Sequence, residues 1–183
     1  MNGKRGVIEV ICGPMFSGKT EELIRRINRG KLAGLKTIVF KPSIDVRYST
    51  AEIVSHDARN LKAINISHSS DVIKRYDGSH LVGIDEAQFL DNGIVDVARE
   101  LANRGIRIII AGLDMDWQGN PFGPIPYLMA IAEKVTKLTA VCQSCGADAH
   151  FSYRITAESE LIVIGAKEKY IPLCRTCFNE RIK

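Results

Sequence analysis

The sequence predicts an α/β fold in which helices cover both faces of a mostly parallel sheet, followed by a small unit that contains four cysteines. From Gly6 to Leu138, short β-branched runs alternate with segments that have apolar residues at helical spacing. Such alternation is typical of a parallel sheet with helices on both faces. A glycine-containing segment separates the first strand from the first helix, and the cysteines follow residue 138. We therefore expect an α/β domain over residues 1–138 and a smaller domain over residues 139–183.

Turn residues bound each of the expected strands and helices. The strands are short apolar runs, at Val7–Cys12, Lys36–Lys41, Leu81–Asp85 and Arg107–Leu113. Helical spacing is found at Thr20–Ala33, Ser70–Tyr76, Asn92–Asn103 and Tyr127–Glu133. Gly34 and Gly105 follow two of these helices, where a glycine commonly ends a helix. After Lys137 the strand-like runs become shorter and no long helix is indicated, which places the domain boundary near residue 138.

The composition is that of an ordinary globular protein. Of the 183 residues, 45% are hydrophobic and 25% are charged, which suits one domain with a small appendage. The net charge of +4 is too small to predict a nucleic-acid partner, which calls for a concentrated basic stripe. Basic residues recur on the first expected helix, and we expect them to form a solvated face: Arg25, Arg26, Arg29 and Lys31.

We expect no membrane partner. The longest apolar stretches, such as residues 108–113, have about six residues, whereas a membrane-spanning helix needs about 20. Lys4 and Arg5 precede a short apolar run, but Glu9 interrupts it and no small-residue cleavage site follows. This pattern predicts a cytoplasmic protein without a signal peptide.

The segment GPMFSGKT at residues 13–20 matches the phosphate-loop pattern G-x-x-x-x-G-K-[ST] in full. In such a loop, backbone N–H groups surround a phosphate at the N-terminal end of the next helix. Lys19 would reach the β- and γ-phosphates, and Thr20 would bind Mg²⁺. Because a strand precedes the segment and a helix follows it, we expect a P-loop NTPase-like site for a nucleoside triphosphate rather than a glycine-rich turn that binds nothing.

Two acids, Asp85 and Glu86, end the third expected strand. Open α/β sheets bind ligands beyond the carboxyl ends of their strands, so Asp85 is expected to hold Mg²⁺ together with Thr20. Glu86 would either accept the proton of an attacking hydroxyl, as in a kinase, or orient a water, as in an NTPase. The acids alone do not choose between these reactions, and a cap on the next helix is the structural alternative.

Four of the five cysteines form two C-x-x-C pairs, separated by 28 residues: Cys142 with Cys145, and Cys174 with Cys177. Four thiolates suit a tetrahedral Zn²⁺ with no open position, which is a structural site. The separation exceeds the roughly 15–20 residues typical of a zinc ribbon, so a longer segment must lie between the pairs. Disulfides are the alternative, which a cytosolic setting disfavours.

Segments spread over nearly the whole chain resemble the type II thymidine kinases. They are GPMFSGKTEEL at 13–23, KPSIDVRY at 41–48, SHD at 55–57, DEAQF at 85–89, AGLDMDWQGNPFGP at 111–124, KLTAVCQSCG at 137–146 and VIGAKEKYIPLCRTC at 163–177. The resemblance implies transfer of the γ-phosphoryl group of ATP to the 5′-hydroxyl of thymidine, and also of deoxyuridine, for DNA precursor synthesis. It makes Glu86 the proton acceptor.

The resemblance also implies the residues that bind each substrate. It assigns the phosphates of ATP to Gly13, Pro14, Met15, Phe16, Ser17, Gly18, Lys19, Thr20, Asp45, Val46, Arg47, Asp85, Ala87 and Gln88. It assigns the nucleoside to Met15, Phe89, Leu113, Trp117, Phe122, Ser152, Leu161, Ile162, Val163, Ile164, Gly165 and Tyr170. The segment between the cysteine pairs would be a lasso-like lid over the base. Trp117 stands where many relatives have a smaller aromatic residue.

The family usually forms homotetramers that dTTP, the pathway end product, inhibits, so we expect both partners here. The alternative from another functional class is an ATP-driven nucleic-acid-binding ATPase, because a zinc ribbon also accompanies a phosphate loop in such proteins. The modest charge disfavours it. A regulatory GTPase is disfavoured because the sequence contains no N-K-x-D motif.

Overall fold

The computed structural model describes residues 6–43, 52–54, 60–156 and 169–182. Its centre is a six-stranded sheet in the order β5-β2-β6-β7-β1-β8, and every neighbouring pair in it is parallel. The strands are β1 (Val7–Cys12), β2 (Thr37–Pro42), β5 (Ile64–Ile66), β6 (Leu81–Ile84), β7 (Arg107–Gly112) and β8 (Lys134–Lys137). The expected parallel sheet is confirmed.

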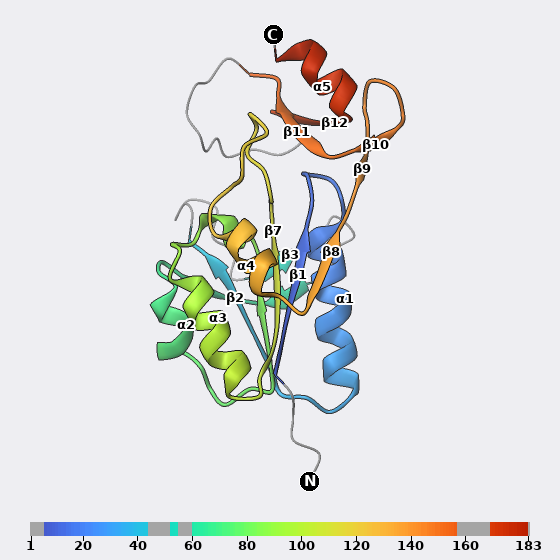
Figure 1. The fold of residues 1–183 in the computed structure, drawn as a ribbon. Coiled ribbons are helices and arrows are strands. Elements are labelled where there is room, and N and C mark those ends of the chain that lie inside the picture. Colours follow the sequence, from blue (N-terminus) through green and yellow to red (C-terminus); the bar gives the residue numbers. More distant parts are fainter. Residues whose placement is uncertain (1–5, 44–51, 55–59, 157–168, 183) are drawn as a thin grey trace.

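Helices cover both faces of this sheet (Figure 1). Helix α1 (Lys19–Leu32) buries Leu23, Ile24 and Ile27 against one face. On the other face lie α2 (Ser70–Lys74), α3 (Ile94–Asn103) and α4 (Ile125–Ile131), which share the larger apolar core. Gly34 and Gly105 have φ of 77° and 81° just beyond α1 and α3, as expected for residues that end a helix.

Strands β1, β6 and β7 begin at the residues that the sequence predicts. Each is an apolar run that the structure buries on both faces, and such a run is visible in the sequence. Strands β5 and β8 were not predicted from the sequence. In β8, three of the four residues of KVTK are exposed, since an edge strand does not require an apolar run. A small hairpin of β3 (Glu52–Val54) and β4 (Asn60–Lys62) was also missed.

The residues after β8 form short strands and one helix around a third, smaller core. These elements are β9 (Ala140–Val141), β10 (Asp148–Ala149), β11 (Phe151–Arg154), β12 (Tyr170–Leu173) and α5 (Arg175–Arg181). Strands β11 and β12 pair antiparallel, and the rings of Phe151 and Phe178 stack with centroids 4.3 Å apart. We call residues 139–156 and 169–182 the C-terminal unit; it lies beyond one end of the central sheet (Figure 1).

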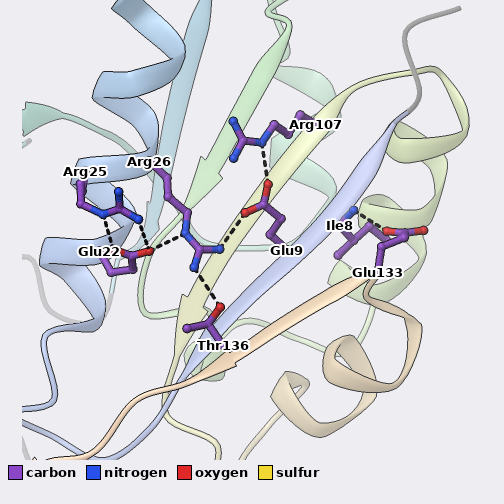
Figure 2. A network of polar contacts seen from close by, with 8 residues as sticks. All are labelled: Ile8, Glu9, Glu22, Arg25, Arg26, Arg107, Glu133 and Thr136. Atoms are coloured by element: carbon purple, nitrogen blue, oxygen red, sulfur yellow. Dashed lines mark hydrogen bonds and ion pairs between the residues drawn. The ribbon is translucent and has the colours of Figure 1, made fainter.

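The expectation that the basic residues of α1 form a solvated face is wrong for Arg26, which is 5% exposed. Figure 2 shows its guanidinium between the sheet and α1, where it donates to Glu9 at 2.7 Å, to Glu22 at 2.7 Å and to Thr136 at 2.9 Å. Arg107 donates to the other oxygen of Glu9 at 2.6 Å. The helical spacing showed which residues share a face, but not that an acid of β1 lies beneath it.

Among the described residues, no helix is long and apolar enough to cross a membrane.

Candidate active site

The phosphate-loop segment, residues 13–20, connects the end of β1 to the first turn of α1. Gly13 and Gly18 have φ of 141° and 81°, a range that residues with a Cβ atom rarely adopt. A Cβ atom at Gly13 would also lie 2.4 Å from the carbonyl oxygen of Leu138. The glycines are therefore required by the turn itself and by the chain that passes beside it.

Lys19 lies inside the loop and is 9% exposed. Its Nζ donates a hydrogen bond to the carbonyl oxygen of Pro14 at 2.7 Å, and Ser17 Oγ donates to the same oxygen at 2.8 Å. Burial lowers the pKa of Lys19, while the nearby charges of Glu86 and Asp85 oppose that shift. The structure thus brings the lysine and both predicted acids into one electrostatic environment.

Asp85, directly after β6, is 5% exposed and lies beside Thr20. Thr20 Oγ1 donates to Asp85 Oδ2 at 3.2 Å. Burial, and then the neighbouring charge of Glu86, raises the pKa of Asp85 to about 7. A hydroxyl oxygen and carboxylate oxygens at this spacing are the donors that a hard cation prefers, so the residues present fit Mg²⁺.

Glu86 adopts a left-handed backbone conformation, with φ of 51°, immediately before the short 3₁₀ helix η2 (Ala87–Phe89). Its Oε2 accepts a hydrogen bond from Gln88 Nε2 at 2.5 Å. The backbone N–H of Leu113, beyond the end of β7, donates to Gln88 Oε1 at 3.0 Å. Gln88 therefore fixes the direction of the Glu86 carboxylate against the neighbouring strand.

Several residues that the sequence assigns to the nucleoside follow β6 and β7. Phe89 and Phe122 meet edge to face, with centroids 5.7 Å apart, and both are half-buried. Leu113 and Trp117 are half-buried in the segment after β7. In the phosphate loop, Phe16 packs against the core of the C-terminal unit.

Strand β11 joins the C-terminal unit to the phosphate loop. The backbone N–H of Met15 donates to Ser152 Oγ at 2.9 Å. Two residues further along the strand, Arg154 donates to the hydroxyl of Tyr170 from both Nε, at 3.1 Å, and Nη2, at 2.8 Å. The guanidinium also lies over the ring of Trp117, 4.6 Å from its centroid. Predicted site residues of both units therefore meet along one face of β11.

Two groups of predicted site residues lie outside the described residues, and the structure does not test them. They are Asp45, Val46 and Arg47, and Leu161, Ile162, Val163, Ile164 and Gly165.

The four predicted metal ligands converge in the C-terminal unit. The Sγ atoms of Cys142, Cys145, Cys174 and Cys177 all lie within 4.8 Å of one another, and Cys145 and Cys174 are 3.6 Å apart. Zn–S bonds of about 2.3 Å in a tetrahedron require sulfurs just under about 4 Å apart. These residues could hold a metal ion, and four thiolates fit zinc.

Sequence reasoning missed two features of the site. Arg154 is 4% exposed, and only its alternation with Ser152 along a strand could have indicated it. Asp114, 6% exposed, pairs with Lys137 through Oδ2 at 2.7 Å. It lies close enough to Lys19 to oppose the lowering of the lysine pKa. Its position directly after β7 was the available signal, because strand ends carry the ligands in such sheets.

The chain is similar in sequence to proteins named thymidine kinase. A relative from Bacteroides thetaiotaomicron named thymidine kinase is 53% identical over 175 residues, which cover 96% of this chain and 88% of the relative. Thymidine kinases from Bacteroides fragilis and a Rhodothermus species are 49% and 51% identical, over 98% and 97% of this chain and 90% and 83% of their own lengths.

A solved structure described as a DNA replication initiation factor has a TM-score of 0.44 and 14% identity, over 74% of this chain and 41% of its own. That similarity is too low to carry an argument. The sequence profile of the thymidine kinase family, in contrast, matches residues 6–178, and the chain belongs to this family.

Proposed function

We propose that this protein is an ATP-dependent kinase that phosphorylates the 5′-hydroxyl of thymidine, and of deoxyuridine, to give the nucleoside monophosphate and ADP. The observation that carries the proposal is the placement of Glu86. Its carboxylate is held by Gln88 next to the Thr20–Asp85 pair and the loop lysine. The family membership supplies the nucleoside as the acceptor.

The transfer needs one proton acceptor and a site for the triphosphate. A bond forms between the nucleoside 5′-oxygen and the γ-phosphorus, and the bond from that phosphorus to the bridging oxygen of ADP breaks. The hydroxyl proton goes to Glu86. Lys19 would leave Pro14 for the phosphates, and its charge would offset the charge on the transferred group.

A magnesium ion would be held by Thr20 and Asp85, and when bound it would neutralise charge on the phosphates. The high pKa of Asp85 follows from burial beside Glu86, and a cation at this position would remove that cost. The remaining residues that the family assigns to ATP, among them Asp45, Val46 and Arg47, belong to the same proposal.

Zinc at Cys142, Cys145, Cys174 and Cys177 would be structural, because four thiolates leave no open position. It would hold together the two ends of the segment between the cysteine pairs. We propose that this segment, including residues 161–165, contributes to the nucleoside site. A homotetramer and inhibition by dTTP complete the proposal and rest on the family alone.

Nucleotide product analysis tests this function. Purified protein receives ATP and Mg²⁺ with thymidine, deoxyuridine, deoxycytidine, a purine deoxynucleoside or no acceptor. We expect dTMP and ADP in equal amounts, and little ADP without an acceptor. The Glu86→Gln variant is the control: it should bind ATP normally but lose about 10²–10⁴-fold in turnover.

Other outcomes would contradict the proposal. Release of ADP without a phosphorylated nucleoside would make Glu86 a water-orienting residue. ADP release that DNA or RNA stimulates would favour the nucleic-acid-dependent ATPase instead.

A further inference from the structure

Arg154 is a charged residue in an almost fully buried position, with 4% of its surface exposed. It lies directly opposite Tyr170 in the antiparallel pairing of β11 with β12. Its Nε and Nη2 both donate to the Tyr170 hydroxyl oxygen, at 3.1 and 2.8 Å. A guanidinium has no acceptor, so the tyrosine oxygen is the acceptor in both bonds. Two bonds to one atom fix the hydroxyl more firmly than one.

The same guanidinium also contacts the ring of Trp117, which comes from the other unit of the protein. Its Cζ lies 4.6 Å from the centroid of Trp117, within the range of a cation–π contact. Within the described part of the chain, the buried indole N–H of Trp117 has no hydrogen-bond partner. Since no hydrogen bond from a described residue orients the indole, the contact with Arg154 is a directional contact available to it there.

Arg154 thus contacts two residues that the family assigns to the nucleoside, and each comes from a different element. Trp117 follows β7, and Tyr170 begins β12. Ser152, two residues before Arg154 on the same strand, accepts the hydrogen bond from Met15 of the phosphate loop. Ser152 and Arg154 of β11 therefore contact both the phosphate loop and two of the nucleoside residues.

We propose that Arg154 is a positioning residue for the nucleoside, which acts by holding Tyr170 and Trp117 in place. The proposal rests on the thymidine kinase function proposed above. A planar guanidinium can donate two bonds to a hydroxyl while its face stacks on a ring, whereas an ammonium group is a compact charge without a face. Lysine at position 154 would keep the charge and lose this geometry.

Steady-state kinetics of Arg154→Lys test the proposal. With ATP and Mg²⁺ saturating, KM for thymidine should rise about tenfold, which is the effect of losing one or two contacts of this kind. The KM for ATP and the kcat should stay within about twofold, because Arg154 contacts Tyr170 and Trp117, whereas Glu86 is held by Gln88. An unchanged KM for thymidine in a folded variant would overturn the proposal.

Trp117 offers a readout that does not depend on activity, because it is the one tryptophan of the sequence. Its emission reports directly on the ring that Arg154 is proposed to hold. We expect thymidine to change this emission in the unchanged protein, and we expect Arg154→Lys to shift the emission and to abolish that change. Emission identical to that of the unchanged protein, with and without thymidine, would contradict the proposal.

Arg26→Lys is the matched control, since Arg26 is 5% exposed but contacts carboxylates away from the nucleoside residues. It should lower the unfolding temperature without raising KM for thymidine or shifting Trp117 emission. If the two variants change both KM values and the unfolding temperature in parallel, Arg154 is merely structural and the proposal fails.

If Arg154→Lys does not fold, Tyr170→Phe is the variant that tests the proposal instead. It removes only the hydroxyl that anchors the guanidinium, so Trp117 emission should shift even though both rings remain. No shift would overturn the proposal. These outcomes can be distinguished from a failure of the proposed function. If the unchanged protein does not make dTMP, the proposed function is refuted. The Trp117 emission measurements would still decide whether Arg154 holds Trp117.

Discussion

Two arginines of this protein are buried to nearly the same extent, Arg26 at 5% and Arg154 at 4% exposed, and their surroundings differ. Arg26 donates to the carboxylates of Glu9 and Glu22 beneath α1 (Figure 2). Arg154, in the C-terminal unit, contacts the hydroxyl of Tyr170 in the same unit and the ring of Trp117, which follows β7. The first arrangement fastens a helix to a sheet, whereas the second joins two side chains that we propose to contact the nucleoside. Burial alone therefore does not indicate the role of an arginine, whereas the chemistry of its partners suggests one.

Removal of the metal should have the largest effect, and it should affect only one of the two arginines. Structural zinc contributes about 10–16 kcal/mol in isolated finger peptides, and Cys174 follows directly after β12. We expect Cys174→Ser to lose the metal and to release the contacts of Arg154, while α1 keeps its protection. Metal analysis, Trp117 emission and hydrogen exchange of α1 measure the three effects. Normal metal content and normal emission would contradict the assignment.

Glu9→Gln should have the next largest effect, on the other arginine. Glu9 accepts from both Arg26 and Arg107, and removing one partner of a buried ion pair costs about 3–5 kcal/mol. Urea unfolding measures the loss of stability, and KM for thymidine should not change.

The control for Glu9→Gln is Glu100→Gln. Glu100 pairs with Arg104 on the surface, where both side chains are about half exposed, and such pairs contribute about 0–1 kcal/mol. Equal losses in the two variants would show that the buried network adds nothing beyond a surface pair.

The comparison also shows how far the sequence could predict this molecule. Strands β1, β6 and β7 were predictable because each is an apolar run buried on both faces. The approach of Thr20 to Asp85 followed from the rule that strand ends share an edge of the sheet. The bond of Gln88 to Glu86 did not follow, because neighbours in sequence do not reveal which side chains face each other across a 3₁₀ turn.

The two arginines were harder still, since their roles depend on residues far away in the chain. Arg26 has the spacing of a solvated helix face, but Glu9 and Thr136 come from two different strands. Arg154 lies in none of the quoted motif segments, and its partners lie 16 residues further along, at Tyr170, and in the segment after β7, at Trp117. Local patterns predict elements, and only tertiary contacts show what a buried charge is for.

Ser152→Ala should have a smaller effect and tests whether β11 reaches the phosphate loop in solution. It removes the acceptor of the Met15 N–H, and a buried donor left unsatisfied costs about 1–3 kcal/mol. We expect kcat/KM to fall for both substrates, because Met15 lies in the loop and beside the nucleoside residues. Ser152→Thr, which keeps the hydroxyl, should restore the value for ATP. A loss confined to thymidine would show that Ser152 acts on the nucleoside alone.

The smallest effect concerns Glu22, the partially exposed member of the Arg26 network. The hydrogen bond from Arg25 is the largest influence; burial opposes it and Arg26 adds to it, so that the pKa of Glu22 falls from 4.5 to about 2. A carboxyl whose pKa is lower in the folded state stabilises the fold above its unfolded pKa, and this contribution disappears as the pH falls. We expect stability to decrease between about pH 4.5 and 2, by no more than the roughly 1 kcal/mol of a solvent-screened pair. Urea unfolding at several pH values measures the slope of stability against pH, and Glu22→Gln should reduce it.

An unchanged slope in that variant would mean that the acid sensitivity arises from other carboxyls. Glu9, whose pKa is also lowered, would be the next to test. Arg154→Lys leaves the Glu22 network intact and should leave this slope as it is, so the two arginines would then be separated by pH as well as by their partners.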